Sequence, residues 1–247
     1  MEHVSSLKTG VRYKATPIGK IPVDWEILSL SKISQINMGR SPPSKDCNER
    51  GVGLPFYQGN AAFGSKYPGP KTWCNLPEKI ADEGDILISV RAPVGEIYVA
   101  PHKCCIGKGI AAVKAKGVHD EFLYQSMLMR RKTLQGLAKG HRFGAINLRE
   151  LSELLIPLPP FSEQKKIGEI LTTVAVAIEK TERIIDKTEQ LKKFLTEEFI
   201  KKDKKTDMAL KTSDSKIQKE LRLKQLLHLL KQGLMQLLLT GKQRVAV

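Results

Sequence analysis

The 247-residue sequence lacks any long uninterrupted hydrophobic run. No window approaches the roughly 18 apolar residues of a membrane-spanning helix, and the polar start Met1-Glu2-His3-Val4 does not resemble a signal peptide. We therefore expect a cytoplasmic protein with no membrane partner. Its 41% hydrophobic content is enough for a normal core, arranged as one large or two small domains.

Cysteine is scarce, and its spacing excludes two common site types. The four cysteines, Cys47, Cys74, Cys104 and Cys105, form no C-x-x-C pair, and two of them are adjacent. This arrangement suits neither a zinc cage nor a disulfide framework, so we expect reduced thiols and no metal site. The glycines of residues 103–109 match neither G-x-x-x-x-G-K-[ST] nor G-x-G-x-x-G, which argues against a nucleotide site in this chain.

Acidic residues are outnumbered, and the formal net charge is +15. A chain this basic is expected to meet a polyanion, and for a cytoplasmic protein the first candidate is nucleic acid. Residues 1–161 carry 22 Lys and Arg against 14 Asp and Glu, and residues 162–247 carry 19 against 12. Lysines on a helical half can serve solubility alone. The surplus of positive charge in residues 1–161 is therefore the stronger indication of nucleic-acid binding.

The stretch 157–167 divides the chain. Pro157, Pro159 and Pro160 hold the backbone extended, and Ser162 is a strong N-cap candidate for a helix. We expect an α/β (α+β) head before this point and long coiled-coil-type helices after it. Within the head we predict an extended arm at 11–26, a short strand or helix at 27–33, loop-rich sequence at 39–77, strands at 85–90, 97–99, 110–113 and 154–156, a helix at 121–130 and a helical turn at 146–151.

Loops of the head interleave cations, amides and aromatic residues, the side chains that reach phosphates and base edges. Any one of them alone is an ordinary surface residue, so only the cluster predicts binding. We find no catalytic constellation, because His141 has no nucleophile or carboxylate beside it and is better read as facing solvent or DNA. The predicted DNA-binding residues are Arg40, Lys45, Tyr57, Gln58, Asn60, Lys66, Tyr67, Lys71, Arg91, Lys108, Lys139, His141 and Arg142.

From residue 167 onward, apolar residues keep a seven-residue register over about five heptads, which predicts a long helix that must pack on another helix. We expect this helix at 161–200, a linker at 201–213 and a second helix at 214–241. The two helices could form a hairpin or pair between subunits, and the sequence does not decide which. The predicted partner-helix residues are Ile167, Ile170, Leu171, Val174, Ile178, Ile184, Leu191, Leu195, Leu227, Leu230 and Leu234.

Four sequence blocks, in order along nearly the whole chain, point to a family. The blocks are Tyr13-Lys14-x-Thr16-x-Ile18-Gly19-x-Ile21-Pro22-x-Asp24-Trp25, Gly84-Asp85-Ile86-Leu87-Ile88-Ser89-x-Arg91-x-Pro93-x-Gly95, Pro157-Leu158-Pro159-Pro160-x-x-Glu163-Gln164-Lys165-x-Ile167 and Gly233-Leu234-Met235-Gln236-x-Leu238-Leu239-Thr240-Gly241. Together they resemble the specificity subunit of type I restriction-modification enzymes.

The resemblance implies a target recognition domain at 1–160 followed by a spacer helix. It also implies a subunit that performs no chemistry and binds no cofactor. Such a subunit binds double-stranded DNA and holds methyltransferase subunits, which use S-adenosylmethionine, and a restriction subunit, which uses ATP and magnesium. Family members usually carry two recognition domains, whereas this chain has one head. It resembles a half-length form that could act as a homodimer with antiparallel spacers on an inverted-repeat bipartite site.

Two other functions are weighed against this interpretation. Ser41-Pro42-Pro43-Ser44 is superficially similar to the [DNS]-P-P-[YF] loop of DNA adenine methyltransferases, but it lacks the aromatic residue that stacks on a flipped base. A stand-alone methyltransferase or nuclease is therefore the weaker alternative. A coiled-coil scaffold whose charge serves only solubility is the other alternative, and the head of roughly 160 residues argues against it.

Overall fold

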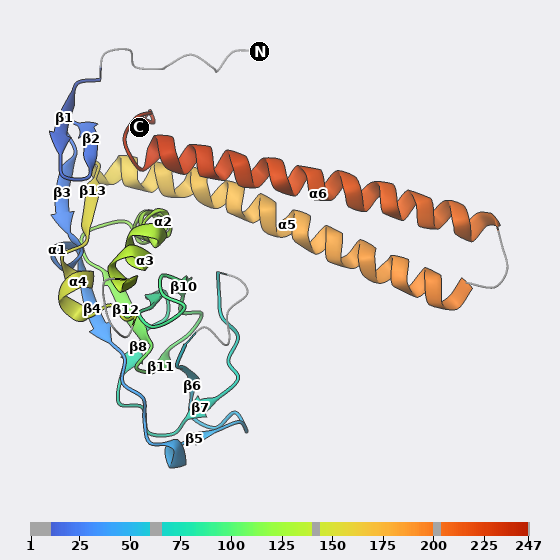
Figure 1. Ribbon diagram of the computed structural model, residues 1–247, viewed down its shortest axis with the longest axis horizontal. Helices are drawn as coiled ribbons and strands as arrows, with labels where there is room; N and C mark the ends of the chain where they lie inside the picture. Colours follow the sequence, from blue (N-terminus) through green and yellow to red (C-terminus); the bar gives the residue numbers. More distant parts are fainter. Residues whose placement is uncertain (1–10, 60–65, 140–143, 200–203, 247) are drawn as a thin grey trace. The chain divides into compact units, whose positions relative to one another are not determined.

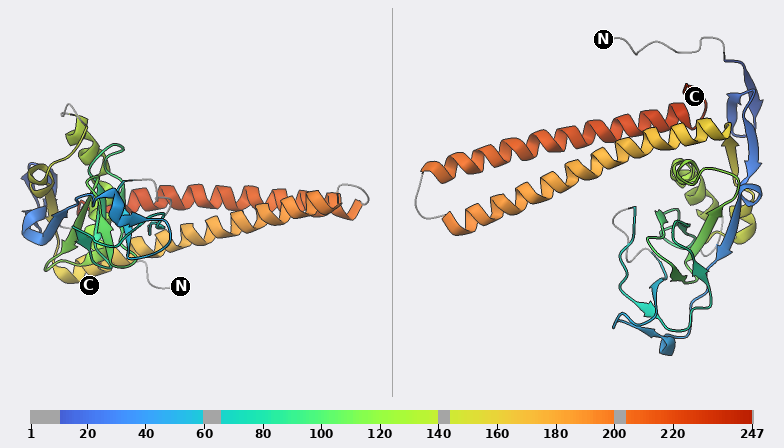
Figure 2. Two further views of the ribbon diagram at one scale, coloured as in Figure 1. Left: turned by 90° about the horizontal axis from the view of Figure 1, so that it is seen from below. Right: turned by 180° about the vertical axis from the view of Figure 1, so that it is seen from behind.

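The computed structural model describes residues 11–59, 66–139, 144–199 and 204–246 (Figures 1 and 2). The chain divides into two compact units. The first unit, called the head here, comprises residues 1–168 together with the tail residues 239–247, and the second, called the hairpin, comprises residues 169–238. Within the described part of the chain, no helix combines the length and apolar character needed to cross a membrane.

The head begins with a small antiparallel pair. Strands β1 (Tyr13–Thr16) and β2 (Gly19–Pro22) form a two-stranded sheet in place of the extended arm expected at 11–26. Gly19 permits this tight turn because its φ of 110° is a conformation that favours glycine. Strand β3 (Glu26–Ser29) then pairs with β13 (Leu155–Leu158), and the short helix α1 (Leu30–Ile33) leads into β4 (Ser34–Met38).

Two larger sheets build the centre of the head. The first has the order β10-β9-β12-β4 and is antiparallel throughout, with β9 (Ile86–Ser89), β10 (Ile97–Val99) and β12 (Ile110–Ala115). These three strands confirm the strands expected at 85–90, 97–99 and 110–113. The second sheet has the order β5-β7-β6-β11-β8. Its strands are β5 (Cys47–Asn48), β6 (Leu54–Tyr57), β7 (Trp73–Cys74), β8 (Ile80–Ala81) and β11 (Cys104–Ile106), and the 3-10 turn η1 (Ser44–Asp46) precedes β5.

Short helices complete the head. Helix α2 (Asp120–Met129) confirms the helix expected at 121–130, and α4 (Leu148–Ser152) begins with a capping box between Asn147 and Glu150. A separate helix, α3 (Arg131–Lys139), follows α2 directly. Arg130 lies between them and donates to the carbonyl oxygens of Leu155 and Ser126.

The hairpin consists of α5 (Phe161–Phe199), whose first turns belong to the head, and α6 (Lys204–Leu238). The long helix predicted after the proline run is confirmed. The linker predicted at 201–213 is wrong from residue 204 onward, because helix α6 already begins at Lys204. Its first turns contain good helix formers at 208–211, and Ser213 is buried, so this segment belongs to the helix and not to a loop.

The two long helices run antiparallel and side by side (Figures 1 and 2). Lys192 of α5 forms an ion pair with Asp214 of α6 at 2.5 Å, and Lys224 pairs with Glu182 at 3.0 Å. Apolar residues buried between the helices include Ile178, Ile185 and Ile217. The sequence left open whether the two helices pair within one chain or between subunits. In this structure α5 and α6 of the same chain pair, and their buried heptad residues form the seam between the two helices.

Candidate nucleic-acid interface

Four strand ends of the head meet at the start of β12. Strands β6 and β11 are parallel, so their carboxyl ends lie at the same edge of their sheet. Strands β4 and β9 both run antiparallel to β12, so their carboxyl ends meet its first residues. The segments that follow β4, β6, β9 and β11 are therefore brought together, although they are far apart in the sequence.

Backbone hydrogen bonds fix these segments to one another. Each bond joins the backbone of a residue just after one strand to the backbone of a neighbouring strand or loop. These bonds fix the backbone positions from which the exposed side chains extend. The bonds run from Gly39 N to Ile110 O at 2.8 Å, Arg40 N to Ile106 O at 3.0 Å, Val90 N to Gly109 O at 2.9 Å and Gly107 N to Tyr57 O at 2.8 Å.

Glycine is required where the backbones approach most closely. A Cβ atom on Gly39 would lie 2.2 Å from the carbonyl oxygen of Gly107, and one on Gly109 would lie 2.4 Å from the carbonyl oxygen of Gln58. Both distances are far inside van der Waals contact with backbone atoms, which cannot move aside cheaply. The glycines of 103–109 thus serve close packing of the loops, which gives them a role other than the nucleotide cradle already discounted.

The meeting point presents four exposed side chains of the predicted DNA-binding set: Arg40, Gln58, Arg91 and Lys108. We call these four residues the strand-end surface. Arg40 forms an ion pair with Glu78 at 2.9 Å, but its side chain is 74% exposed, and pairs this exposed hold each other weakly. Its guanidinium can therefore exchange Glu78 for a phosphate. Cationic side chains suit contacts with phosphates, and an amide suits a contact with a base edge, so segments that carry both are suited to nucleic acid.

A pocket of about 370 Å³ adjoins the strand-end surface. Its lining combines hydroxyl, amide and ammonium groups with apolar surface, which is the mixture that recognises base edges. Lys45 is exposed in η1, directly after the lining residue Ser44. The lining residues with polar side chains include Ser41, Ser44, Gln58, Lys71 and Thr72.

The structure does not bring all predicted residues to this surface. Tyr57 is only 1% exposed, and its hydroxyl donates to the carbonyl oxygen of Pro68 at 3.1 Å, so its side chain belongs to the core of the head and is not one of the exposed side chains of this surface. Lys66 forms an ion pair with Glu121 at 2.6 Å, and its ammonium lies 4.7 Å from the ring centroid of Tyr124. The positive charge of Lys66 is therefore paired with groups within the head.

Tyr67 is half exposed and lies beside Lys66, whose ammonium is 5.6 Å from the centroid of its ring. Both residues line a different pocket, which also contains the carboxylates of Asp85 and Asp120 and is therefore poorly suited to phosphate. Three further candidates, Asn60, His141 and Arg142, lie outside the described residues, as does the side chain of Lys139 at the end of α3.

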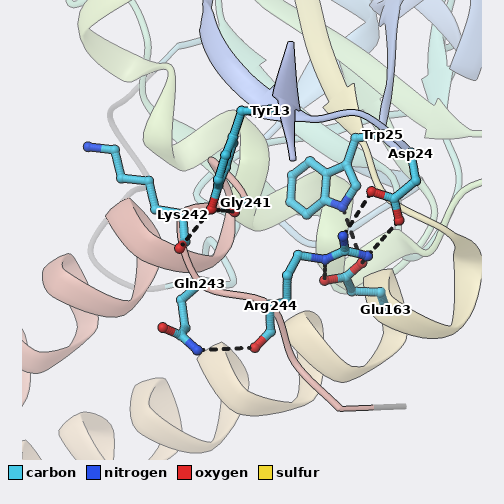
Figure 3. A network of polar contacts seen from close by, with 8 residues as sticks. All are labelled: Tyr13, Asp24, Trp25, Glu163, Gly241, Lys242, Gln243 and Arg244. Atoms are coloured by element: carbon cyan, nitrogen blue, oxygen red, sulfur yellow. Dashed lines mark hydrogen bonds and ion pairs between the residues drawn. The ribbon is translucent and has the colours of Figure 1, made fainter. Parts of the chain in front are cut away.

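A second group of polar residues joins the tail to the rest of the head (Figure 3). Arg244 donates from Nε and Nη2 to the two carboxylate oxygens of Glu163, both at 2.7 Å, and to both oxygens of Asp24 at 2.8 Å. Trp25, which is fully buried, donates from Nε1 to Glu163 at 3.2 Å. We call Asp24, Trp25, Glu163 and Arg244 the tail clamp.

The electrostatics of the clamp follow from this geometry. The hydrogen bonds that Arg244 donates to Glu163, and after them those to Asp24, raise the pKa of Arg244, so the guanidinium stays charged. The hydrogen bonds from Arg244 hold the pKa of Asp24 below its usual range. The Glu163 side chain is only 2% exposed, so these partners within the head take the place of water around its carboxylate.

Packing and hydrogen bonds extend the clamp along the tail. The Tyr13 hydroxyl lies 3.2 Å from the carbonyl oxygens of both Gly241 and Lys242. Gly241 has a φ of 69°, and a Cβ atom there would lie 2.3 Å from Cδ of Pro22, so only glycine fits. The sequence blocks contained Tyr13, Asp24, Trp25, Glu163 and Gly241, but no spacing rule pairs residues at opposite ends of a chain, and Arg244 was missed.

Residues 22–190 match the family described as "Type I restriction modification DNA specificity domain". The chain belongs to this family. The MjaX type I restriction enzyme specificity subunit of Methanocaldococcus jannaschii is 42% identical over 185 residues, covering 73% of this chain and 44% of that protein. The MjaIX specificity subunit of the same organism is 29% identical over 177 residues, covering 65% of this chain and 40% of that protein.

Solved structures agree with this assignment. The crystal structure of the HsdS subunit from Thermoanaerobacter tengcongensis matches with a TM-score of 0.58 and 30% identity, covering 92% of this chain and 47% of that one. The resemblance and the predicted fold class, a mixed α/β head with long helices, are confirmed. The names of the relatives also agree with a specificity subunit and not an enzyme. The chain spans about half the length of the relatives it matches.

Proposed function

We propose that this specificity-domain chain is the DNA-reading subunit of a type I restriction-modification complex and binds double-stranded DNA through the strand-end surface. The observation that carries the proposal is the convergence of Arg40, Gln58, Arg91 and Lys108 from four separate segments at the start of β12. Methyltransferase subunits, using S-adenosylmethionine, and a restriction subunit, using ATP and magnesium, would supply the chemistry. This chain would select the site and hold those subunits.

The test is the salt dependence of DNA binding. Fluorescence anisotropy of a labelled duplex gives the slope of log affinity against log salt, which falls by about one for each phosphate contact removed. We expect this loss for Arg40→Ala, Arg91→Ala and Lys108→Ala. Lys116→Ala is the matched control, because Lys116 is an exposed lysine just beyond the other end of β12. Unchanged slopes in all three variants would refute the assignment of this surface.

We further propose that two copies of the chain assemble through the hairpin. The seam is the set of heptad positions at which α5 and α6 pack against each other, such as Ile178, Ile185 and Ile217. Beside it, apolar residues repeat every seven positions on both helices, and each lies one position before a seam position. In antiparallel helix pairs these positions lie on the same side of the pair. The residues are Ile170, Ala177, Ile184 and Leu191 on α5, and Leu223, Leu230 and Leu237 on α6.

This second apolar face is open in the single chain. Leu191, Leu223 and Leu230 are about half exposed, whereas the ion-paired residues Glu182 and Asp214 each lie one position after a seam residue and so on the opposite side. Burying two such faces against each other would form a four-helix arrangement, and each copy would contribute one head. This differs from the expected pairing of single spacers between subunits, since each chain already fills its own seam.

A symmetric pair of heads would read an inverted-repeat bipartite site, because the symmetry of the protein is mirrored in its target. The chain's span of about half its relatives' length is consistent with a second copy supplying the other half. Sedimentation velocity tests the pairing. We expect a dimer for the wild type and a monomer for Leu230→Glu, with Leu229→Glu, 64% exposed and one position off the face, as the control. A monomeric wild type would contradict the proposal.

A further inference from the structure

Gln58 is the one uncharged member of the strand-end surface. It follows β6 directly, and the preceding residue, Tyr57, is locked in the core through its ring and its hydroxyl bond to Pro68. The side chain of Gln58 is exposed and lines the 370 Å³ pocket together with Ser41 and Lys71. The amide of Gln58 therefore lines the same pocket as the ammonium-bearing side chain of Lys71.

The glycine loop 107–109 holds Gln58 in position. A Cβ atom on Gly107 would lie 3.0 Å from both Cα and Cγ of Gln58, so the loop backbone lies directly against the first part of this side chain. Gly109 lies closer still, since a Cβ atom there would be 2.4 Å from the Gln58 carbonyl oxygen, and Gly107 N bonds to the carbonyl of Tyr57. A side chain whose Cα and Cγ atoms are held by packing loses less conformational entropy when it binds. This favours recognition that depends on the exact placement of its amide.

The chemistry of the amide identifies what it would read. Glutamine has a carbonyl acceptor and an NH₂ donor side by side, and this pair matches N6 and N7 of adenine in the major groove. Lysines such as Lys71 and Lys108 act as point charges, which suits phosphates and carries no base discrimination. We propose that Gln58 is a specificity-determining residue that reads an adenine, with the flanking cations holding the backbone. This inference rests on the proposed DNA-reading function.

The experiment selects bound duplexes from a randomised pool with the full-length chain and sequences them. For Gln58→Ala we expect the preference for adenine at one position of the site to fall about tenfold or more, as loss of a bidentate base contact implies. For Gln58→Arg we expect guanine to replace adenine at that same position, because arginine pairs with O6 and N7 of guanine. Gln35→Ala is the matched control, since Gln35 is exposed near the start of β4 and distant in register from the strand-end surface.

The outcomes separate the inference from the function on which it rests. If the wild type selects no sequence at all, the proposed function fails. If the wild type selects a site and Gln58→Ala keeps the same preference at every position, the assignment of Gln58 is overturned while the function stands. A reduced salt slope with unchanged preference would also overturn it, because Gln58 would then contact the backbone. An unchanged unfolding midpoint for each variant verifies that the exposed substitution leaves the head folded.

Discussion

Replacing Arg244 with alanine should destabilise the head by removing the cation of the tail clamp. The substitution leaves the carboxylate of Glu163, whose side chain is 2% exposed, with the hydrogen bond that the indole of Trp25 donates at 3.2 Å (Figure 3). A buried charge that loses its partner cannot recover the solvation it gave up on folding. The change therefore tests whether the tail is an integral part of the head.

The size of the effect follows from burial on each side of Arg244. Removing one partner of a buried ion pair costs about 3–5 kcal/mol, whereas pairs in solvent contribute about 0–1 kcal/mol. Glu163 belongs to the first class, and Asp24, with 49% of its side chain exposed, belongs to the second. Because the Trp25 hydrogen bond to Glu163 survives, we expect the low end, about 3 kcal/mol, or on the order of 10 °C in Tm for a unit of this size.

The assay is urea unfolding followed by the fluorescence of Trp25, in a background where Trp73, the other tryptophan, is replaced by phenylalanine. Trp25 is fully buried beside the clamp, with the Arg244 guanidinium 5.9 Å from its ring centroid, so its emission reports this part of the head. Arg222→Ala is the matched control, because Arg222 is an exposed arginine of α6. We expect its unfolding midpoint to equal that of the wild type.

A double-mutant cycle isolates the ion pair from other losses. With Glu163→Gln, the buried group is neutral and no longer needs a cation, so adding Arg244→Ala should cost less than it does alone. The expected coupling between the two changes is about 1–3 kcal/mol. Purely additive effects, or a cost below about 0.5 kcal/mol for Arg244→Ala, would refute the view that Arg244 compensates a buried charge.

Three further outcomes follow from individual residues. Gly241→Ala should destabilise the head by about 1–3 kcal/mol in the same urea assay, because its φ is positive and its Cβ would strike Pro22. Gly233→Ala, in open space on α6, should stabilise the hairpin by about 0.5–1 kcal/mol in urea unfolding followed by circular dichroism of the helices. The hydrogen bonds from Arg244 lower the pKa of Asp24, so the stability contributed by this carboxylate is present above the unfolded pKa of about 3.9. It should be lost as the pH falls from there through the lower folded pKa, which urea midpoints measured across this range would show. Burial raises the pKa of Cys104 to about 12, and mass spectrometry should find this thiol unmodified by iodoacetamide in the native protein near pH 8.

The strands of the antiparallel sheet were predictable because each is a short apolar run bounded by turn residues. The sequence 86–89 is Ile-Leu-Ile-Ser, and β10 and β12 read the same way. Strand β11 was not predicted, since its two cysteines were considered only for a metal site or a disulfide and the glycines after them only for a nucleotide site. Only its pairing with β6 and β8 buries it, and pairing between distant segments leaves no period in the sequence.

The same limit explains the mixed outcome for the candidate site. Gln58 and Tyr57 are neighbours in a segment rich in turn formers, and composition alone gave them the same role. The parallel pairing of β6 with β11 places Ile106 opposite Tyr57 and buries its side chain, while Gln58 lies just beyond the pairing and is exposed. Arg91 and Lys108 join Gln58 only through the register of β9, β11 and β12.

The sequence blocks that carry the family resemblance meet mainly at the tail clamp. Tyr13, Trp25, Glu163 and Gly241 come from three of the four blocks and lie together there, whereas Gln58 belongs to none of the blocks. The resemblance therefore rests on residues that fix how the chain closes on itself. It could identify the family from sequence, but it carries no information about the base that the strand-end surface would read. Target sequence has to be measured at Gln58 and its neighbours, where pairing between distant strands determines which side chains face DNA.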